Sequence, residues 1–222
     1  MSTQVLIVGL GQFGTSLARA LAEQGSEVLA VDVDESRVKA VVPHVSDALT
    51  LDATDEEALQ SLAPQDRGVC VCALGENSRE ASIMVTAMLR QLDAPHIVSR
   101  AADSLHARVL RLVGAHEVVR PEHDYGERLA MRLVWNRVLR VLPLGGEVVL
   151  TELVAPEPFW GQTLEELKLF ETYGVVVAAV RADDASPETT VIPNPAKPLE
   201  SGDVLLLVST RQDAKRVSEA GR

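Results

Sequence analysis

Cysteine, net positive charge and long apolar runs are scarce in this chain of 222 residues. Its two cysteines, Cys70 and Cys72, lie two apart in one apolar stretch. That spacing places both side chains on one face of a single strand, so we expect core packing rather than a disulfide or a zinc site. No apolar run approaches the roughly 20 residues that span a bilayer, and a strand pattern begins at once, so we expect a cytoplasmic protein without membrane insertion.

The charge balance argues against nucleic acid as a partner. With 32 acidic and 21 basic residues, the formal net charge is −11. Proteins bind nucleic acid and anionic lipid by placing lysine and arginine side chains against the phosphate groups. This chain has no excess of basic residues for that purpose. Apolar residues make up 46% of the chain, which is enough to bury the core of one or two folded domains.

The motifs of several enzyme classes are missing. The chain contains no G-x-S-x-G, H-E-x-x-H or G-x-x-x-x-G-K-[ST] pattern, and neither Tyr125 nor Tyr173 begins a Tyr-x-x-x-Lys pair. A dehydrogenase would need an acid or base beside its nicotinamide, and the chain after residue 145 is short for a substrate domain. We therefore predict binding without catalysis, with a small NAD-dependent oxidoreductase as the alternative.

The most informative feature that is present is a glycine-rich turn between an apolar strand and a helix. Gly9, Gly11 and Gly14 form a G-x-G-x-x-G motif. In such a motif the first glycine permits a tight turn, the second lets the backbone approach a pyrophosphate, and the third lets the helix pack on the strand. The predicted nucleotide-binding loop comprises Gly9, Gly11, Gln12, Phe13 and Gly14.

Asp32 follows the second apolar strand. Its distance from the glycine motif is close to the spacing of about 20 residues that is typical of a carboxylate that binds both ribose hydroxyls. The sequence thus predicts an adenosine ribose. Because residues 32–35 contain no arginine to neutralise a 2′-phosphate, NADP is disfavoured. The alternative is a doubly wound domain that keeps the glycine turn and binds nothing.

Apolar strand patterns alternate with helical patterns up to about residue 120, which predicts an α/β, Rossmann-like doubly wound parallel sheet. The expected strands are residues 4–8, 27–31, 47–51, 68–74, 95–99 and 116–119, and the expected helices include 16–23, 55–62, 77–92 and 103–113.

The sequence after residue 123 predicts a long helix and then, beyond residue 146, short strands separated by proline-containing and acidic loops. Apolar residues at helical spacing predict a long helix over 124–142, which Pro143 to Gly146 would end. A second, smaller α+β domain would follow, with strands at 147–154, 175–181, 189–192 and 204–209 and helices at 163–167 and 211–220. Residues 183–188 are predicted to form a solvated hairpin loop rather than a metal site. The predicted division is a nucleotide-binding domain (1–123), a linker helix (124–144) and a C-terminal ligand domain (145–222).

Nearly the whole chain resembles the RCK (regulator of potassium conductance, or KTN) proteins, the cytosolic gating subunits of Ktr and Trk potassium-uptake systems. The segments that carry the resemblance are Gly9–Gly14, Val31–Asp34, Leu51–Asp55, Ala73–Asn77, Ser99–Ala101, Gly114–Glu122, Trp160–Leu167, Ile192–Pro195 and Gly202–Leu207. The resemblance implies a regulatory subunit that couples adenine-nucleotide binding to potassium transport by a membrane channel or transporter. An adaptor that senses nucleotide or redox state for another partner is the remaining alternative.

Site residues follow by position from this resemblance. Asp32 would hold the ribose, Asp52 and Ala53 would line the adenine pocket, Asn77 would lie near the ribose and phosphate, and Arg100 would meet phosphate. From the residues alone, Asp52 and Asn77 could instead cap helices, and Arg100 could form a surface ion pair.

The resemblance also implies an assembly. Glu122 would lie near a dimer interface and take part in binding a divalent or monovalent cation beside the nucleotide phosphates. The helix 124–142 would pack on a partner subunit, giving a homodimer and, in the family, octameric rings. Potassium-uptake members often carry arginine where this chain has Gln12. Since that charge is missing, terminal-phosphate recognition weakens, and ADP or NAD(H) would bind comparably to ATP.

In some relatives the C-terminal domain binds cyclic di-AMP, through residues that resemble Arg181, Asn194 and Pro195. The acidic stretch between Arg181 and Asn194 would repel that ligand if it folded inward, although salt would screen it if it projected away.

Overall fold

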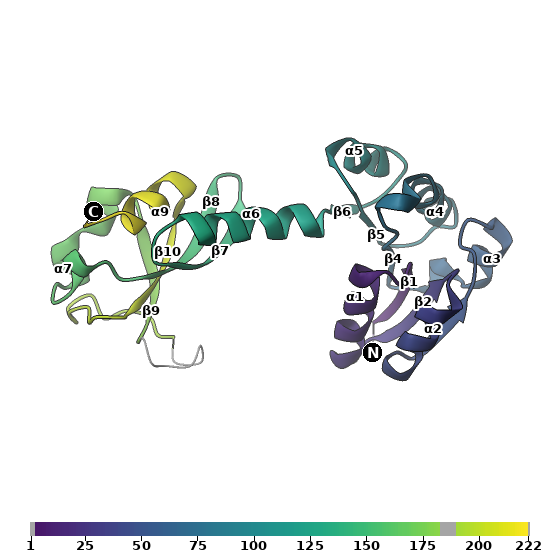
Figure 1. The fold of residues 1–222 in the computed structure, drawn as a ribbon, viewed down its shortest axis with the longest axis horizontal. Helices are drawn as coiled ribbons and strands as arrows, with labels where there is room; N and C mark the ends of the chain where they lie inside the picture. Colours follow the sequence, from purple (N-terminus) through teal and green to yellow (C-terminus); the bar gives the residue numbers. More distant parts are fainter. Residues whose placement is uncertain (1–2, 183–189, 222) are drawn as a thin grey trace. The chain divides into compact units, whose positions relative to one another are not determined.

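The computed structural model describes residues 3–182 and 190–221. The predicted loop 183–188 and the first residue of the predicted strand 189–192 lie outside these ranges. The chain divides into two compact units, residues 1–122 and 123–222, and each is described by itself (Figure 1). Among the described residues, no helix is long and apolar enough to cross a membrane.

The first unit is a parallel sheet of six strands in the order β3-β2-β1-β4-β5-β6. The strands are β1 (Gln4–Val8), β2 (Glu27–Asp32), β3 (Asp47–Thr50), β4 (Val69–Cys72), β5 (Ile97–Arg100) and β6 (Glu117–Val119). The helices are α1 (Gln12–Glu23), α2 (Glu35–Val41), α3 (Glu56–Ser61), α4 (Arg79–Gln91) and α5 (Ser104–Leu112), with short 3₁₀ turns η1 (Val42–His44), η2 (Pro64–Asp66) and η3 (Glu76–Ser78). The predicted Rossmann-like doubly wound sheet is confirmed. Chain order reverses between β1 and β4, which is where open α/β sheets bind ligands.

Both faces of this sheet are covered, as continuous apolar strands require. Residues of α1 and α2 pack with Ile7 and Val28 on one face, and residues of α3 and α4 pack with Leu6 and Val8 on the other. Cys70 and Cys72 belong to the second cluster as free thiols. Burial raises the pKa of Cys70 to about 12 and that of Cys72 to about 11, so the predicted packing role of both cysteines is confirmed.

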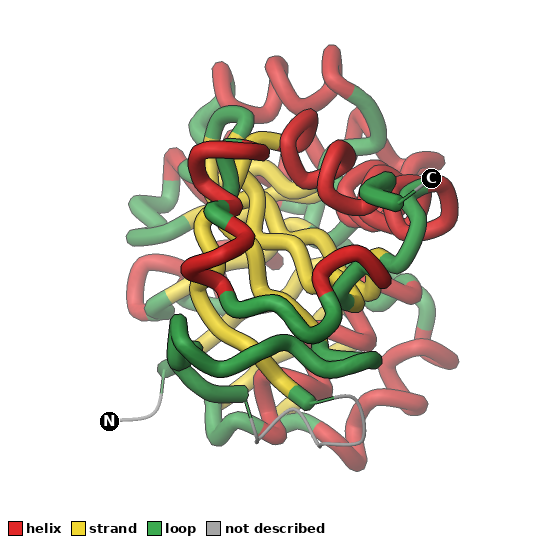
Figure 2. Tube along the Cα trace, turned by 90° about the vertical axis from the view of Figure 1, so that its left-hand side faces the viewer, coloured by secondary structure: helices red, strands yellow, loops and turns green. Residues whose placement is uncertain are grey.

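The second unit is built on an antiparallel sheet in the order β7-β8-β10-β9. Its elements are α6 (Pro121–Val134), β7 (Val138–Gly145), β8 (Val148–Val154), η4 (Glu157–Phe159), α7 (Leu164–Leu167), α8 (Leu169–Tyr173), β9 (Val176–Arg181), β10 (Val204–Thr210) and α9 (Arg211–Ser218). Ala214 and Val217 of α9 pack against Leu153 and Leu205 of the sheet. Figure 2 distinguishes the strands and helices by colour. The smaller α+β unit is therefore confirmed.

The predicted helix over residues 124–142 is wrong in its second half. The helix α6 ends at Val134, and residues 138–145 form the strand β7, so most of the predicted linker beyond Val134 belongs to the second sheet. Arg137 adopts a left-handed φ of 61°, which stops helical propagation. The register of β7 against β8 shifts between Val138 and Arg140, so that Val138 and Val141 are both buried although they lie three residues apart. This irregular strand therefore reproduces the apolar spacing of a helix.

The described part of the predicted strand 189–192 is also shorter than expected. It contributes one bridge, in which Val180 and Val191 exchange two backbone hydrogen bonds of 2.9 Å each.

Candidate functional site

The three glycines of the motif differ in what the fold demands of them. Gly9 has a φ of +100°, and a Cβ there would lie 3.1 Å from the Leu74 backbone nitrogen. A Cβ on Gly14 would collide with the carbonyl oxygen of Gly9. By contrast, a Cβ on Gly11 would meet only open space. The fold explains Gly9 and Gly14, whereas the absence of a side chain at Gly11 suits a ligand that approaches the backbone.

Asp32 ends β2 and is 7% exposed. Its Oδ2 accepts a hydrogen bond of 2.6 Å from the Leu10 backbone N–H, and its Oδ1 accepts one of 2.9 Å from the N–H of Asp34. The guanidinium of Arg37, in the first turn of α2, lies 3.5 Å from Oδ2. The Asp32 carboxylate thus holds the glycine loop against the carboxyl end of β2.

Two cavities adjoin along this edge of the sheet and share Gly9, Asp32, Val33, Leu74 and Ser78. The more polar cavity has a volume of about 240 Å³ and is also lined by Gly11, Arg37, Ala73, Gly75 and Asn77. The more apolar one has a volume of about 100 Å³ and is also lined by Val8, Val31, Leu51, Asp52, Ala53, Thr54, Ala81 and Val85. We call the two together the edge groove. A groove with backbone N–H groups and a carboxylate at one end, and small aliphatic side chains at the other, can hold a phosphorylated nucleoside.

Asp52 and Asn77 do not take the capping roles that were open to them. The N-cap of α3 is Asp55, and the N-cap position of α4 is Ser78. Asp52 instead accepts hydrogen bonds of 2.7 and 2.9 Å from the hydroxyl and N–H of Thr54, which hold the pKa of Asp52 below its usual value. Both residues line the edge groove, and their ligand roles stay predictions.

Arg100 and Glu122, predicted to meet phosphate and cation, contact each other. The Arg100 Nη2 lies 2.6 Å from the Glu122 Oε1, so the alternative of an ion pair is realised. The Arg100 guanidinium also lies 5.9 Å from the centre of the Phe13 ring, and a Cβ on Gly75 would lie 3.6 Å from its Nη1. Arg100 is therefore held beside the glycine loop and the edge groove.

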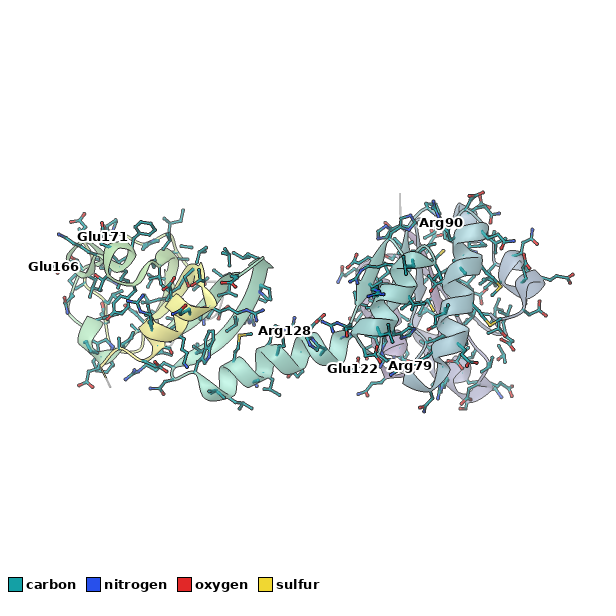
Figure 3. The ribbon with its side chains drawn as sticks, turned by 90° about the horizontal axis from the view of Figure 1, so that it is seen from above. Arg79, Arg90, Glu122, Arg128, Glu166 and Glu171 are labelled. Atoms are coloured by element: carbon teal, nitrogen blue, oxygen red, sulfur yellow. The ribbon has the colours of Figure 1, made fainter. Side chains whose placement is uncertain are left out.

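Glu122 opens the first turn of α6, with 64% of its side chain exposed (Figure 3). Within residues 3–182 and 190–221, no three acidic, histidine or cysteine side chains gather as a metal site. Gln12 begins α1 at an exposed position, next to the half-buried Phe13. A cation at Glu122 would therefore need further ligands, such as phosphate oxygens and a second subunit.

Two of the three residues predicted to bind cyclic di-AMP line neighbouring cavities. Asn194 lines one of about 160 Å³ and Pro195 lines one of about 440 Å³, and the two cavities share Leu164 and Pro193. Arg181 lies 3.5 Å from Glu152, whose other oxygen lies 3.5 Å from Arg140. Any site built from all three needs a further contribution.

Sequence reasoning missed Arg37, Ala81 and Val85 as lining residues. Ala81 and Val85 are four residues apart on α4, a spacing that places both on one face of the helix. Arg37 lies five residues after Asp32, within the first turn of the next helix. These spacings were the available signals, but they identify lining residues only once the sheet edge is located.

Family models match both halves of the chain. A TrkA-N domain spans residues 5–121 and a TrkA-C domain spans residues 148–220. The chain belongs to the TrkA-N/TrkA-C family. This TrkA-type chain is 34% identical to the Ktr system potassium uptake protein C of Bacillus subtilis (strain 168), over 97% of this chain and 96% of that one. It is 35% identical to the Ktr system potassium uptake protein A of Vibrio alginolyticus, over 92% of this chain and 91% of that one.

The expected resemblance to regulators of the Ktr and Trk systems is thereby confirmed. Among solved structures, the GsuK RCK domain superposes with a TM-score of 0.68 at 20% identity, covering all of this chain and 48% of that one. The GsuK channel bound to NAD superposes with a TM-score of 0.66 at 18% identity, covering 96% of this chain and 38% of that one. The TrkA-type chain thus spans about half or less of these GsuK chains, and the likeness establishes the fold.

Proposed function

We propose that this protein is a regulatory, non-catalytic subunit of a potassium-uptake system that binds an adenine nucleotide in the edge groove. Its relatives of similar length are Ktr system potassium uptake proteins. The observation that carries the nucleotide assignment is Gly11, where a Cβ would meet open space and which lines the same cavity as the buried Asp32. The protein would act at the cytoplasmic face of the membrane on an integral membrane potassium channel or transporter subunit.

The nucleotide would lie along the groove in a defined direction. Adenine would occupy the apolar cavity beside Ala53, Ala81 and Val85, and the ribose would lie at Asp32. The phosphates would lie at Gly11 and the N-terminus of the 12-residue helix α1, whose free N–H groups favour anions. Because Gln12 is uncharged, ADP and NAD(H) would bind comparably to ATP. Solved GsuK structures of low identity hold NAD and ADP.

The ion pair between Arg100 and Glu122 offers a way to couple binding to α6. A nucleotide phosphate would compete with Glu122 for the Arg100 guanidinium, because both are anions that accept its N–H groups. Release would free the Glu122 carboxylate for a cation shared with phosphate oxygens and a second subunit. The nucleotide would bind one arrangement of the subunits more tightly than another, and it would thereby increase the population of the arrangement that it prefers.

The helix α6 supports a homodimer. None of its residues is buried, and Leu133 and Val134 are 73% and 76% exposed. Its first half carries Glu122, Asp124 and Glu127, and its second half carries Arg128 and Arg132. Antiparallel pairing with a second copy would place acidic halves against basic halves, in a self-complementary interface. Such dimers would assemble further into an octameric ring.

The C-terminal unit is proposed to bind cyclic di-AMP through Arg181, Asn194 and Pro195. Asn194 and Pro195 line two neighbouring cavities, and the site would form between two C-terminal units. Calorimetric titration of cyclic di-AMP into the wild type and Asn194→Ala tests this assignment. Equal heats from both proteins would remove Asn194 from the site.

The regulatory function is tested by potassium flux into vesicles that contain the membrane subunit of a Ktr system. Addition of this protein with ATP, ADP or NADH should change the flux to different extents. Equal fluxes with every nucleotide and without any would refute ligand gating. The oxidoreductase alternative predicts a change in NADH absorbance with an alcohol, aldehyde or hydroxy acid, and we expect none.

A further inference from the structure

Arg37 occupies a position in the edge groove that the spacing of the sequence did not suggest. It lies in the first turn of α2, and its side chain lines the cavity that also contains Gly11 and Asp32. Its Nη1 lies 3.5 Å from the Asp32 Oδ2, and its Nε lies 3.4 Å from the Asp34 Oδ2. Residues 32–35 themselves contain no arginine that could neutralise a 2′-phosphate. In the fold, an arginine just beyond that segment reaches the same carboxylate.

The negative charge of Asp32 is already compensated within the protein. One carboxylate oxygen accepts the Leu10 N–H at 2.6 Å and the other accepts the Asp34 N–H at 2.9 Å. The Arg37 guanidinium adds a positive charge on the same side. A carboxylate held by two backbone donors and a cation repels a neighbouring phosphate less than an uncompensated one does.

Arg37 can leave Asp34 without undoing the start of α2. The Asp34 Oδ1 caps the helix through hydrogen bonds of 2.8 Å from the Ser36 N–H and 2.5 Å from the Ser36 hydroxyl. Arg37 contacts the other oxygen of Asp34. The Arg37 side chain is 53% exposed, so turning its guanidinium toward a ligand requires little repacking.

Asp32 marks where the ribose hydroxyls lie, so a cation beside it lies at the 2′ position rather than at the 5′-phosphates near Gly11. We infer that Arg37 is a specificity-determining residue that binds the 2′-phosphate of an adenosine ribose. The edge groove then accepts 2′-phosphorylated dinucleotides of the NADP(H) class as well as NAD(H). This inference rests on the proposed nucleotide binding and adds the class of ligand.

The matched probes are NAD and NADP, which differ only in the 2′-phosphate. Calorimetric titration of both into the full chain compares the wild type, Arg37→Gln and the control Lys39→Gln. Lys39 lies on the same helix, pairs with Glu35 at 2.7 Å and does not line the groove. In the wild type, NADP should bind within about tenfold of NAD. Arg37→Gln should weaken NADP binding by about tenfold or more, as expected for loss of a charge-assisted hydrogen bond, and NAD binding by less than about threefold. Lys39→Gln should change neither affinity by more than about twofold.

Two results would overturn the inference and leave nucleotide binding intact. The first is wild-type protein that binds NAD but binds NADP more than about a hundredfold more weakly. The second is an Arg37→Gln variant that loses NAD and NADP affinity equally, because Arg37 would then only hold Asp32 in place. If the wild type binds ADP but neither NAD nor NADP, the inference fails and the proposed nucleotide binding stands, whereas a wild type that binds none of the three refutes both.

Discussion

The Nη2 of Arg100 lies 2.6 Å from the Oε1 of Glu122, although sequence reasoning gave these residues separate ligands. Arg100 is 18% exposed at the end of β5, and Glu122 lies in the first turn of α6. The groups proposed for phosphate and cation therefore pair with each other within the chain. A phosphate that approaches the Arg100 Nη2 competes with Glu122 for it.

Glu122→Gln should strengthen nucleotide binding in the absence of divalent cations. The substitution removes the charge that competes for Arg100, so ADP affinity measured in chelator should rise by about threefold to tenfold. Asp124→Asn is the matched control, because Asp124 lies on the same helix and its Oδ1 lies 3.4 Å from the His123 Nδ1. Unchanged or weaker ADP binding by Glu122→Gln would contradict the proposed competition.

Gly14→Ala should destabilise the fold strongly. The new methyl group would collide with the backbone carbonyl of Gly9, so the turn or α1 would have to shift. We expect a loss of about 3 kcal/mol or more in the free energy of unfolding, measured by chemical denaturation. A loss below about 1 kcal/mol would show that the loop yields and that its geometry is not fixed by packing.

His106 predicts a pH dependence of stability. Its Nδ1 accepts the Ala102 N–H at 3.2 Å, so the neutral ring carries its proton on Nε2, which lies 2.9 Å from the Ser82 hydroxyl. Burial lowers the pKa of His106 from 6.5, and the positive charge of Arg79 lowers it further, whereas the negative charge of Asp103 opposes both effects. The unfolded state then binds more protons, so the stability contribution is complete above about pH 6.5 and is lost as pH falls below it toward the folded-state pKa.

Chemical denaturation at pH 7.5 and pH 5.5 checks this sign. The wild type should lose more stability between the two values than His106→Gln does. His44→Gln, which changes an exposed histidine, should behave like the wild type. An equal loss in all three proteins would remove His106 as the source of the dependence.

Leu133→Asp should convert the proposed homodimer into monomers. The side chain is 73% exposed on α6, so a charge there costs the isolated chain little, whereas in an apolar interface it is left desolvated and unpaired. Light scattering during size exclusion should show a mass reduced by at least half, with a melting temperature within a few degrees of the wild type. The control Val42→Asp, at a 50% exposed site on η1, should stay dimeric. A dimer that persists in Leu133→Asp would place the interface elsewhere.

The first sheet was readable from the sequence because each strand is a short apolar run bounded by turn residues. Central strands buried on both faces, such as Val69–Cys72, carry the signal in composition alone. The region after Val134 was not readable, because a register shift in β7 buries Val138 and Val141 three residues apart. Arg137, which lies between the helix and the strand, has a left-handed φ. No local sequence pattern predicts that conformation.

The location of the candidate site was predictable because the glycine motif and Asp32 both lie at the ends of predicted strands. The glycine loop and Asp32 meet at one edge, as their spacing required. Arg37 was not predictable as a lining residue, because its reach depends on how α2 leaves the sheet. The pairing of Arg100 with Glu122 depends on β5 and α6 being brought together across 22 residues of chain, which no local spacing reveals.

Gly11→Ala gives the most direct test of the central claim that the edge groove holds a nucleotide against bare backbone. The methyl group would meet open space in the fold, so stability should stay within about 1 kcal/mol of the wild type, the loss expected at an N-cap. Calorimetric titration with ADP should show one bound nucleotide per wild-type chain and an affinity at least about tenfold lower in Gly11→Ala. Equal ADP affinity in both proteins, or no binding by the wild type, would contradict the account.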